Sequence, residues 1–483
     1  MWGTDIGLPV TMTVNAEQRT YFLFGDTDYS DPAQYALGQI VRQEADPADP
    51  FVLDNGVNQG DVVAYTTDTN PDDGISLTRV LRNVENSGAP VCNQLDDDDD
   101  LRSLFVPGVH DNTANYFYED VSEITGSSCL GAALNATPTG AFAVDGTMYS
   151  ITAVQNSFVV ETLPDKGFLA SSDDGALTWT LLNNGVPISG TTGGPGAKFI
   201  HIDALEVDAR QYQDPIRTYP CPLPEPPSGD SRALLLFGIG TWLNTGGYLG
   251  MTFVEDLEAS RDDPLLPLRM YYYAGPPNCW VEGDEDAAVP ILDAQAGLHY
   301  AHFESPCNYR VFEQSGGLDY VSVARLTGTV SGSPVDRLLL STNPGYATCK
   351  NVGTCCGGTV NPENPNLCDF PADPALLSDS GLGPVVVTSD PFQPWEVARR
   401  TDDSLEFTLI EQDPGTMVGP GPHCKTNVPY TYQLGGYAPV MIDTLTRVNS
   451  AGDGFDVYMN GSVGRDEGYN VDTARFTVRE VTN

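Results

Sequence analysis

Positive charge is scarce in this sequence. Of 483 residues, 23 are Lys or Arg, and only four of these are Lys, against 66 Asp and Glu, which gives a formal net charge of −43. Contacts with nucleic-acid phosphates need clustered Lys and Arg, so the charge argues against nucleic acid as a partner. An acidic surface instead suits a neutral or cationic substrate, or bound calcium.

Long apolar runs and metal-type cysteine pairs are also missing. No stretch of about 18 apolar residues predicts a membrane span, so we expect a soluble protein. The ten cysteines include no Cys-x-x-Cys pair, which favours disulfides formed in an oxidising compartment. Because no signal peptide is visible after Met1, a secreted or cell-surface location (extracellular or periplasmic) is inferred from the cysteines alone. The sequence leaves the disulfide pairing and the oligomeric state open.

Two common hydrolase motifs are absent. No Gly-x-Ser-x-Gly elbow occurs, which disfavours a Ser/His/Asp hydrolase. No His-Glu-x-x-His occurs either, and the pair His299 and His302 has no convincing third ligand for zinc. No cofactor is therefore expected to be required, although a bound calcium ion is compatible with the sequence.

Strand signals dominate what is present. With 49 Gly, 37 Pro and no clear amphipathic helix, the fold class is predicted to be all-β. A polar or small-residue start followed by two or more strands recurs five times, near residues 3, 138, 198, 319 and 436. We therefore predict a five-bladed β-propeller, a single domain over residues 1–483 with long loop insertions at 86–130, 208–231 and 343–384. The last repeat is expected to begin with one long strand over residues 436–448.

The first repeat carries two carboxylates at matched ends of a hairpin. Residues 9–14 and 20–24 are apolar or β-branched, with turn residues at 15–18 between them. Asp5 precedes the first strand and Asp26 ends the second, so both are expected on one edge. Neighbouring carboxylates shift each other's pKa, which suits acid/base work on a sugar acetal. The structural alternative is that each Asp merely closes a turn.

The starts of the other repeats supply further polar and aromatic residues. His201 and Asp203 lie two apart on a predicted strand and so share a face. We expect Asp203 to join Asp5 and Asp26 as a catalytic residue. The residues expected to bind substrate are His201, Trp242, Tyr437, Thr139 and Ser322. Carboxylates with aromatic planes are typical of a carbohydrate site, although each of these residues is also a common packing residue.

Two acidic motifs are interpreted as structural. Residues 172–179 are close to the Asp-box of propellers, Ser-x-Asp-x-Gly-x-Thr-Trp, with Ala176 in place of the second glycine. Asp174 is expected to hold its turn and to carry no chemistry. The run Asp96–Asp100 is predicted to be a solvated loop, with calcium binding as the alternative.

Several short motifs together resemble a known family. These are Gly3–Gly7 with Phe24–Thr27, Pro138–Gly140 leading to Asp145–Tyr149, Phe237–Trp242, Tyr273–Gly275 before Trp280, and Gly435–Pro439. Over nearly the whole chain they resemble a bacterial five-bladed propeller family first catalogued as a domain of unknown function. Some members of that family are endo-D-arabinanases, glycoside hydrolases that act on furanoside polymers.

The resemblance implies that Asp5 and Asp26 belong to an acidic cluster at the tunnel mouth. One departure concerns the family's Glu just ahead of its Ser-Val strand, because this chain has Tyr320 before Val321 and Ser322. The sequence thus favours a secreted hydrolase of an arabinan-like polysaccharide or oligosaccharide. The alternatives are a non-catalytic carbohydrate-binding or calcium-stabilised surface propeller, and a phosphate or lactone hydrolase with a tunnel calcium.

Overall fold

A computed structural model gives the structure of part of the chain. The described residues are 5–25, 62–70, 75, 77–81, 135–155, 166–177, 179–190, 197–213, 221–240, 246–293, 321–342, 359–360, 368–369, 385–388, 396–397, 437–465 and 468–478. Contacts group the chain into two compact units. The first unit is Met1–Ile202, Thr252–Met270 and Glu467–Asn470, and the second is Asp203–Met251, Tyr271–Asp466 and Val471–Asn483.

The first unit opens with a four-stranded antiparallel sheet. Its strands follow one another in chain order: β1 (Asp5–Val14), β2 (Glu17–Gly25), β3 (Val62–Thr66) and β4 (Arg79–Leu81). The β1–β2 hairpin is confirmed, with a turn of two residues, Asn15 and Ala16, instead of four. Both turn residues have positive φ, which matches the twist of a tight hairpin. Asp5 pairs with Gly25, so the predicted matching of the strand ends is also confirmed.

A second sheet of the first unit has the same order. It contains β5 (Asn135–Val144), β6 (Thr147–Gln155), β7 (Lys166–Ser172) and β8 (Thr180–Leu181). Asp145 and Gly146 form the predicted hairpin turn, both with positive φ. The Asp-box also folds as expected, since Asp174 Oδ1 accepts hydrogen bonds from the Ser172 hydroxyl at 2.9 Å and the Leu177 N–H at 3.0 Å.

One short helix occurs among the strands. Helix α3 (Val254–Asp262) lies in the first unit, where no helix of normal length was predicted. It is only nine residues long and weakly amphipathic, so its periodicity is hard to detect. Glu255 and Asp256 in its first turn and Arg261 in its last complement the helix dipole. Asn183 connects the short η2 helix (Asn183–Gly185) to the segment after α3, because its Oδ1 accepts from the Leu268 N–H at 2.8 Å.

In the second unit a six-stranded sheet comes first in the chain. Its strands are β9 (His201–Asp208), β10 (Arg232–Ile239), β11 (Gly246–Phe253), β12 (Tyr271–Gly275), β13 (Cys279–Glu282) and β14 (Pro290–Asp293), and the ends of β9 and β11 extend into the first unit. Short 3-10 helices follow β9 and β13, namely η3 (Ala209–Tyr212) and η4 (Glu285–Ala287). A disulfide joins Cys221 to Cys279, with 5.0 Å between the Cα atoms. It ties the Pro-rich insertion to β13 and confirms that cysteines of this chain form disulfides.

Two four-stranded sheets and one small ribbon follow in the second unit, except that the first three residues of the last strand are grouped with the first unit. One sheet orders β15 (Val321–Val330), β16 (Ser333–Thr342), β19 (Val385–Thr388) and β20 (Glu396–Val397), and β17 (Thr359–Val360) pairs with β18 (Cys368–Asp369). The other contains β21 (Tyr437–Met441), β22 (Arg447–Val448), β23 (Phe455–Arg465) and β24 (Gly468–Val478). The prediction of one strand over 436–448 is wrong, because η8 (Asp443–Leu445) interrupts it.

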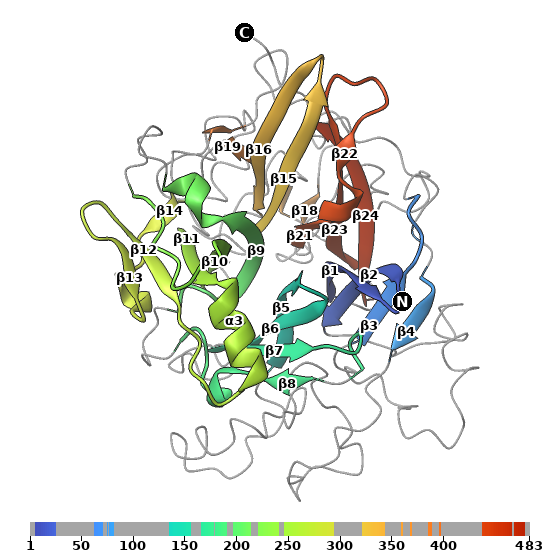
Figure 1. The fold of residues 1–483 in the computed structure, drawn as a ribbon. Helices are drawn as coiled ribbons and strands as arrows, with labels where there is room; N and C mark the ends of the chain where they lie inside the picture. The colour runs from blue at the N-terminus through green and yellow to red at the C-terminus, as the bar shows by residue number, and fades with distance from the viewer. Residues whose placement is uncertain are drawn as a thin grey trace, which may run out of the picture. The chain divides into compact units, whose positions relative to one another are not determined.

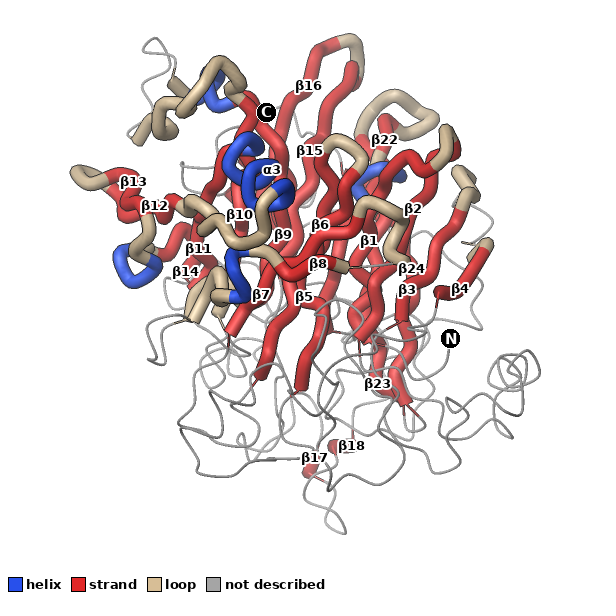
Figure 2. Tube along the Cα trace, turned by 60° about the horizontal axis from the view of Figure 1, so that its bottom comes forward, coloured by secondary structure: helices blue, strands red, loops and turns tan. Residues whose placement is uncertain are grey.

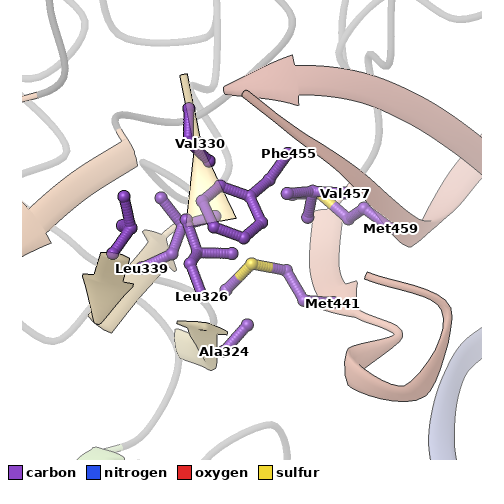
Figure 3. Close-up of a cluster of buried hydrophobic side chains, with 9 residues drawn as sticks. Ala324, Leu326, Val330, Leu339, Met441, Phe455, Val457 and Met459 are labelled. Carbon is purple, nitrogen blue, oxygen red and sulfur yellow. The ribbon is translucent and has the colours of Figure 1, made fainter. Parts of the chain in front are cut away.

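A hydrophobic core joins these two sheets (Figure 3). Leu326 and Leu339 from the β15–β16 hairpin meet Met441, Phe455 and Val457 from β21 and β23, and all five side chains are buried. Sheets packed face to face through alternate apolar side chains are what the period-two pattern of these strands requires.

Four-stranded antiparallel sheets are the unit of a propeller blade. The described part of the chain contains four of them and one six-stranded sheet, and their first strands begin at residues 5, 135, 201, 321 and 437. Strands dominate both views of the backbone, and helices are short (Figures 1 and 2). The all-β class and the blade-like sheets are thus confirmed. The closure of five blades into one ring and the single domain stay predictions.

Close backbone packing at Gly140 gives a stability prediction. A Cβ atom added there would clash with the Ile202 carbonyl oxygen, whereas one added at Gly229 would meet no atom within 4 Å. We expect Gly140→Ala to lower the free energy of unfolding by about 1–3 kcal/mol, as overpacking typically does. The control Gly229→Ala should stay within about 0.5 kcal/mol. Urea unfolding measures both, and equal stabilities would contradict the close approach.

Candidate functional site

The free edge of β15 holds two carboxylates. In its sheet β15 is the end strand, next to β16 only, and alternate N–H groups of a strand point to the same edge. The Val323 N–H donates to Asp203 Oδ2 at 2.7 Å. Two residues along, the Arg325 N–H lies close enough to the Asp443 carboxylate to lower its pKa. Two donors separated by two residues of a strand are about 7 Å apart, so both acids lie along one short edge.

Asp203 is held by three hydrogen bonds. Besides the Val323 N–H, its carboxylate accepts from the Ser322 hydroxyl and from its neighbouring Ala204 N–H, both at 2.8 Å. The side chain is half-buried, and this burial raises its pKa to about 6, against the opposing effect of the three donors. Desolvation penalises the charged form, which explains the direction.

Asp443 is the more accessible acid of the two. It opens η8, and its side chain reaches solvent although protein surrounds it. Desolvation by that surrounding protein raises its pKa to about 7, and the negative charge of Asp203 raises it further. The Arg325 N–H has the opposite effect. At neutral pH the site therefore pairs an ionised Asp203 with an Asp443 that is protonated in part, which is how unequal environments separate an acid from a base.

Ser322 connects this edge to a third strand. The side chain is fully buried, and its hydroxyl donates to Asp203 while accepting the Met441 N–H at 2.8 Å. The relay Asp203–Ser322–Met441 thus links β9, β15 and β21, the first strands of three sheets. Ser322, predicted to bind substrate, has a structural role here, and contact with substrate stays a prediction.

Thr139 and His201 are buried in the first unit. The Thr139 side chain is 1% exposed, and its hydroxyl donates to the Ile200 carbonyl oxygen, which ties β5 to the residue before β9. His201 has no exposed surface, and burial lowers its pKa to about 3, so the ring is neutral near neutral pH. A neutral, enclosed imidazole neither takes up a proton nor reaches solvent at that pH. Substrate binding by these two residues stays a prediction.

The remaining predicted residues are placed only in part. Asp5 is the first residue of β1 and Tyr437 the first of β21, whereas Asp26 and Trp242 lie outside the described residues, as does the acidic run Asp96–Asp100. Asp203 and Ser322 are thus the predicted site residues that the second unit brings into contact.

Sequence reasoning missed Asp443. It lies six residues after Tyr437, inside the stretch interpreted as one continuous strand, where a carboxylate looked like an ordinary exposed strand residue. The short η8 helix turns the chain at this point and places Asp443 beside β15. A signal was available in the sequence, because Asp203 and Asp443 each follow the start of a repeat by a few residues.

The described ranges contain no cluster of three or more His, Cys, Asp or Glu side chains arranged to hold a metal ion. Within the same ranges, no helix has the length and apolar character needed to cross a membrane.

Comparison with known proteins gives remote structural neighbours. No protein-family model matches the chain, and a search of curated proteins found no match. A Trypanosoma rangeli sialidase mutant displaying trans-sialidase activity is 9% identical at a TM-score of 0.33, covering 98% of this chain and 44% of its own. A xylan beta-1,4-xylosidase from Bacillus halodurans C-125 is 9% identical with a TM-score of 0.35, and the match covers 100% of this chain and 54% of the xylosidase. The GH43_1 enzyme from Xanthomonas citri complexed with xylose is 7% identical with a TM-score of 0.34, and the match covers 98% of this chain and 87% of that enzyme.

These neighbours are β-propeller glycoside hydrolases. The chain spans about half the length of the first two.

The raised pKa values predict how stability depends on pH. A folded-state pKa above the unfolded value stabilises the fold below the unfolded pKa, and this contribution is lost as pH rises through the folded pKa. We therefore expect Asp443→Asn to melt a few degrees above the wild type at pH 8 and at the same temperature near pH 4. Thermal unfolding across this range measures the difference. A variant less stable than the wild type at pH 8 would contradict the raised pKa.

The relay predicts a cost for removing one hydroxyl. Ser322→Ala leaves the Met441 N–H without its acceptor and removes one donor from Asp203, so the free energy of unfolding should fall by about 1–3 kcal/mol. The matched control is Ser333→Ala, at an exposed position of the same hairpin. Denaturant unfolding compares the two, and a loss no larger than that of the control would show that the relay contributes little.

Proposed function

We propose that this chain is a secreted glycoside hydrolase that cleaves an arabinan-like furanoside polymer or a related polysaccharide. The observation that carries the proposal is the pair of acids on the edge of β15. Their environments raise the pKa of Asp203 to about 6 and that of Asp443 to about 7. Cleavage of a glycosidic bond needs one protonated and one ionised carboxyl group, and this pair supplies both near neutral pH.

Each acid has a role that follows from its surroundings. Asp443, exposed and protonated in part, would donate a proton to the oxygen of the leaving sugar. Asp203, ionised and held by three donors, would take a proton from the attacking water. The two N–H groups of β15 beside which they lie are about 7 Å apart along the strand, and we propose a pair with room for a water molecule, as in inverting enzymes. Anomeric inversion of the product is therefore part of the proposal.

Asp5 and Asp26 remain the competing pair from the sequence. The hairpin register supports them, since Asp5 faces Gly25 directly before Asp26. Under this version Asp5 and Asp26 supply the acid and base while Asp203 assists, with Trp242 and Tyr437 binding sugar. A ring of five blades with a common acidic pore is the architecture that both versions assume, and bound calcium there remains part of the proposal.

A non-catalytic carbohydrate-binding protein is the second candidate. Two observations favour it: the three hydrogen bonds that tie Asp203 to neighbouring backbone and side chain, and Tyr320 in place of the family's Glu. A fully bonded carboxylate stabilises strands as readily as it activates water. In this case the protein would bind glycans without releasing products, and a chelator would lower its melting temperature if calcium stabilises the fold.

Single Asp→Asn variants decide between these versions. With an arabinan-type polymer as substrate, Asp443→Asn and Asp203→Asn should lower the rate of product release by about 10²- to 10⁴-fold. The control Asp145→Asn, at an exposed hairpin turn, should keep wild-type rates.

Three other outcomes of this experiment have distinct meanings. If Asp5→Asn and Asp26→Asn lose activity while Asp443→Asn keeps full activity, Asp5 and Asp26 are the catalytic pair. Wild-type rates in all four variants would reject both pairs. Sugar binding by a wild type that releases no product would establish the second candidate.

A further inference from the structure

The β12–β13 hairpin of the second unit presents an aromatic face that the site on β15 does not use. In its register Tyr271 lies opposite Glu282 and Tyr273 opposite Trp280, and directly opposed residues of an antiparallel pair share a face. We call Tyr271, Tyr273 and Trp280 the aromatic face. The Tyr273 and Trp280 rings are in contact, edge to face, with centroids 5.5 Å apart. Tyr271 and Trp280 are half-buried, so part of each remains accessible, whereas Tyr273 is buried and supports the Trp280 ring.

The β12–β13 hairpin is fixed by packing on its other face and by a disulfide. On its other face Tyr272 is only 5% exposed, and the buried Glu285 of η4 lies near enough to raise its pKa together with burial. The disulfide from Cys221 anchors Cys279, the residue next to Trp280. A fixed backbone lets an aromatic face bind a ligand without a large loss of side-chain and loop entropy.

The charge of this segment restricts the ligand. Residues 271–293 contain five Asp or Glu and no Lys, Arg or His. Anionic ligands such as nucleic acid, acidic glycans or anionic lipids are therefore disfavoured. Aromatic planes beside a carboxylate suit a neutral sugar chain, because the planes cover the apolar C–H faces of the rings while Glu282 can accept from hydroxyl groups.

The position of the hairpin separates this face from the acids. The sheet orders β13, β12, β11, β10 and β9, so Trp280 and Asp203 lie on opposite edge strands. Four strand-to-strand steps span about 19 Å. Figure 1 shows β12 and β13 at the outer end of this sheet. A mono- or disaccharide cannot reach both places, whereas a polymer can.

We propose that the aromatic face is a second binding site for a neutral polysaccharide, remote from the acids on β15. The inference rests on the proposed function for the identity of the polymer, an arabinan-type chain, but the binding itself does not require catalysis. The aromatic face would keep the polymer bound to the enzyme, at a place away from the glycosidic bond that is cleaved.

The test uses the full chain and two readouts, retention of the protein in a gel containing soluble arabinan and hydrolysis of short arabino-oligosaccharides. Trp280→Ala should weaken retention about tenfold, because it removes the ring that would cover the apolar face of a sugar. Its rate on short substrates should equal the wild type. Trp280→Phe, which keeps a ring, should lose less. The control Leu265→Ala removes an apolar side chain that is 71% exposed in the first unit, and it should change neither readout.

Several results would overturn the proposal. These are wild-type retention in Trp280→Ala, an equal loss in Leu265→Ala, or a parallel loss of retention and of activity on short substrates, which would indicate general damage to the fold. Retention abolished by 1 M salt would also overturn it, because salt screens attraction between charges and not contact between an aromatic ring and a neutral sugar. If the wild type hydrolyses nothing while Trp280→Ala still loses retention, the proposed function fails and this inference stands. If the wild type hydrolyses arabinan and Trp280→Ala keeps wild-type retention, the proposed function stands and this inference fails.

Discussion

The relay from Met441 through Ser322 to Asp203 is the interaction on which the second unit most depends. It joins strands that come from three sheets and are separated by more than a hundred residues in the chain. A strand at the end of a sheet has unpaired N–H groups, and leaving these groups buried without acceptors is costly. In β15 the Val323 N–H is satisfied by the carboxylate of Asp203 and not by a further strand, and the Arg325 N–H lies near the carboxylate of Asp443. The same bonds that complete the edge therefore collect acidic side chains on it.

This arrangement explains why structure and chemistry are difficult to separate here. A carboxylate that accepts backbone N–H groups is normally stabilised as the anion and has a low pKa. In this site burial outweighs that effect for Asp203, and the second acid nearby adds to it for Asp443. The protein thus keeps two acids with raised pKa values, which lower its stability at neutral pH, and such acids are a common feature of functional sites. If these side chains only accepted hydrogen bonds to stabilise the fold, neutral acceptors such as Asn could do so without the cost of burying a charge.

Much of the fold could be predicted from period-two patterns and turn residues. The Asp145-Gly146 turn fixed the β5–β6 hairpin, and the Asp-box was recognised despite Ala176. Helix α3 and the break at η8 were missed because nine and three residues are too short to show a period. Asp203 and Ser322 were predicted as site residues, but their mutual contact depends on distant strands coming together. Asp443 depends on the same packing and on a turn that the sequence does not signal.

The most direct test of the central claim is a crystal structure of the Asp443→Asn variant with an arabino-oligosaccharide. The account predicts a sugar lying along the free edge of β15, with its glycosidic oxygen near position 443 and a water molecule near the Asp203 carboxylate. A sugar bound beside Asp5 and Asp26 instead, with the β15 edge unoccupied, would contradict it.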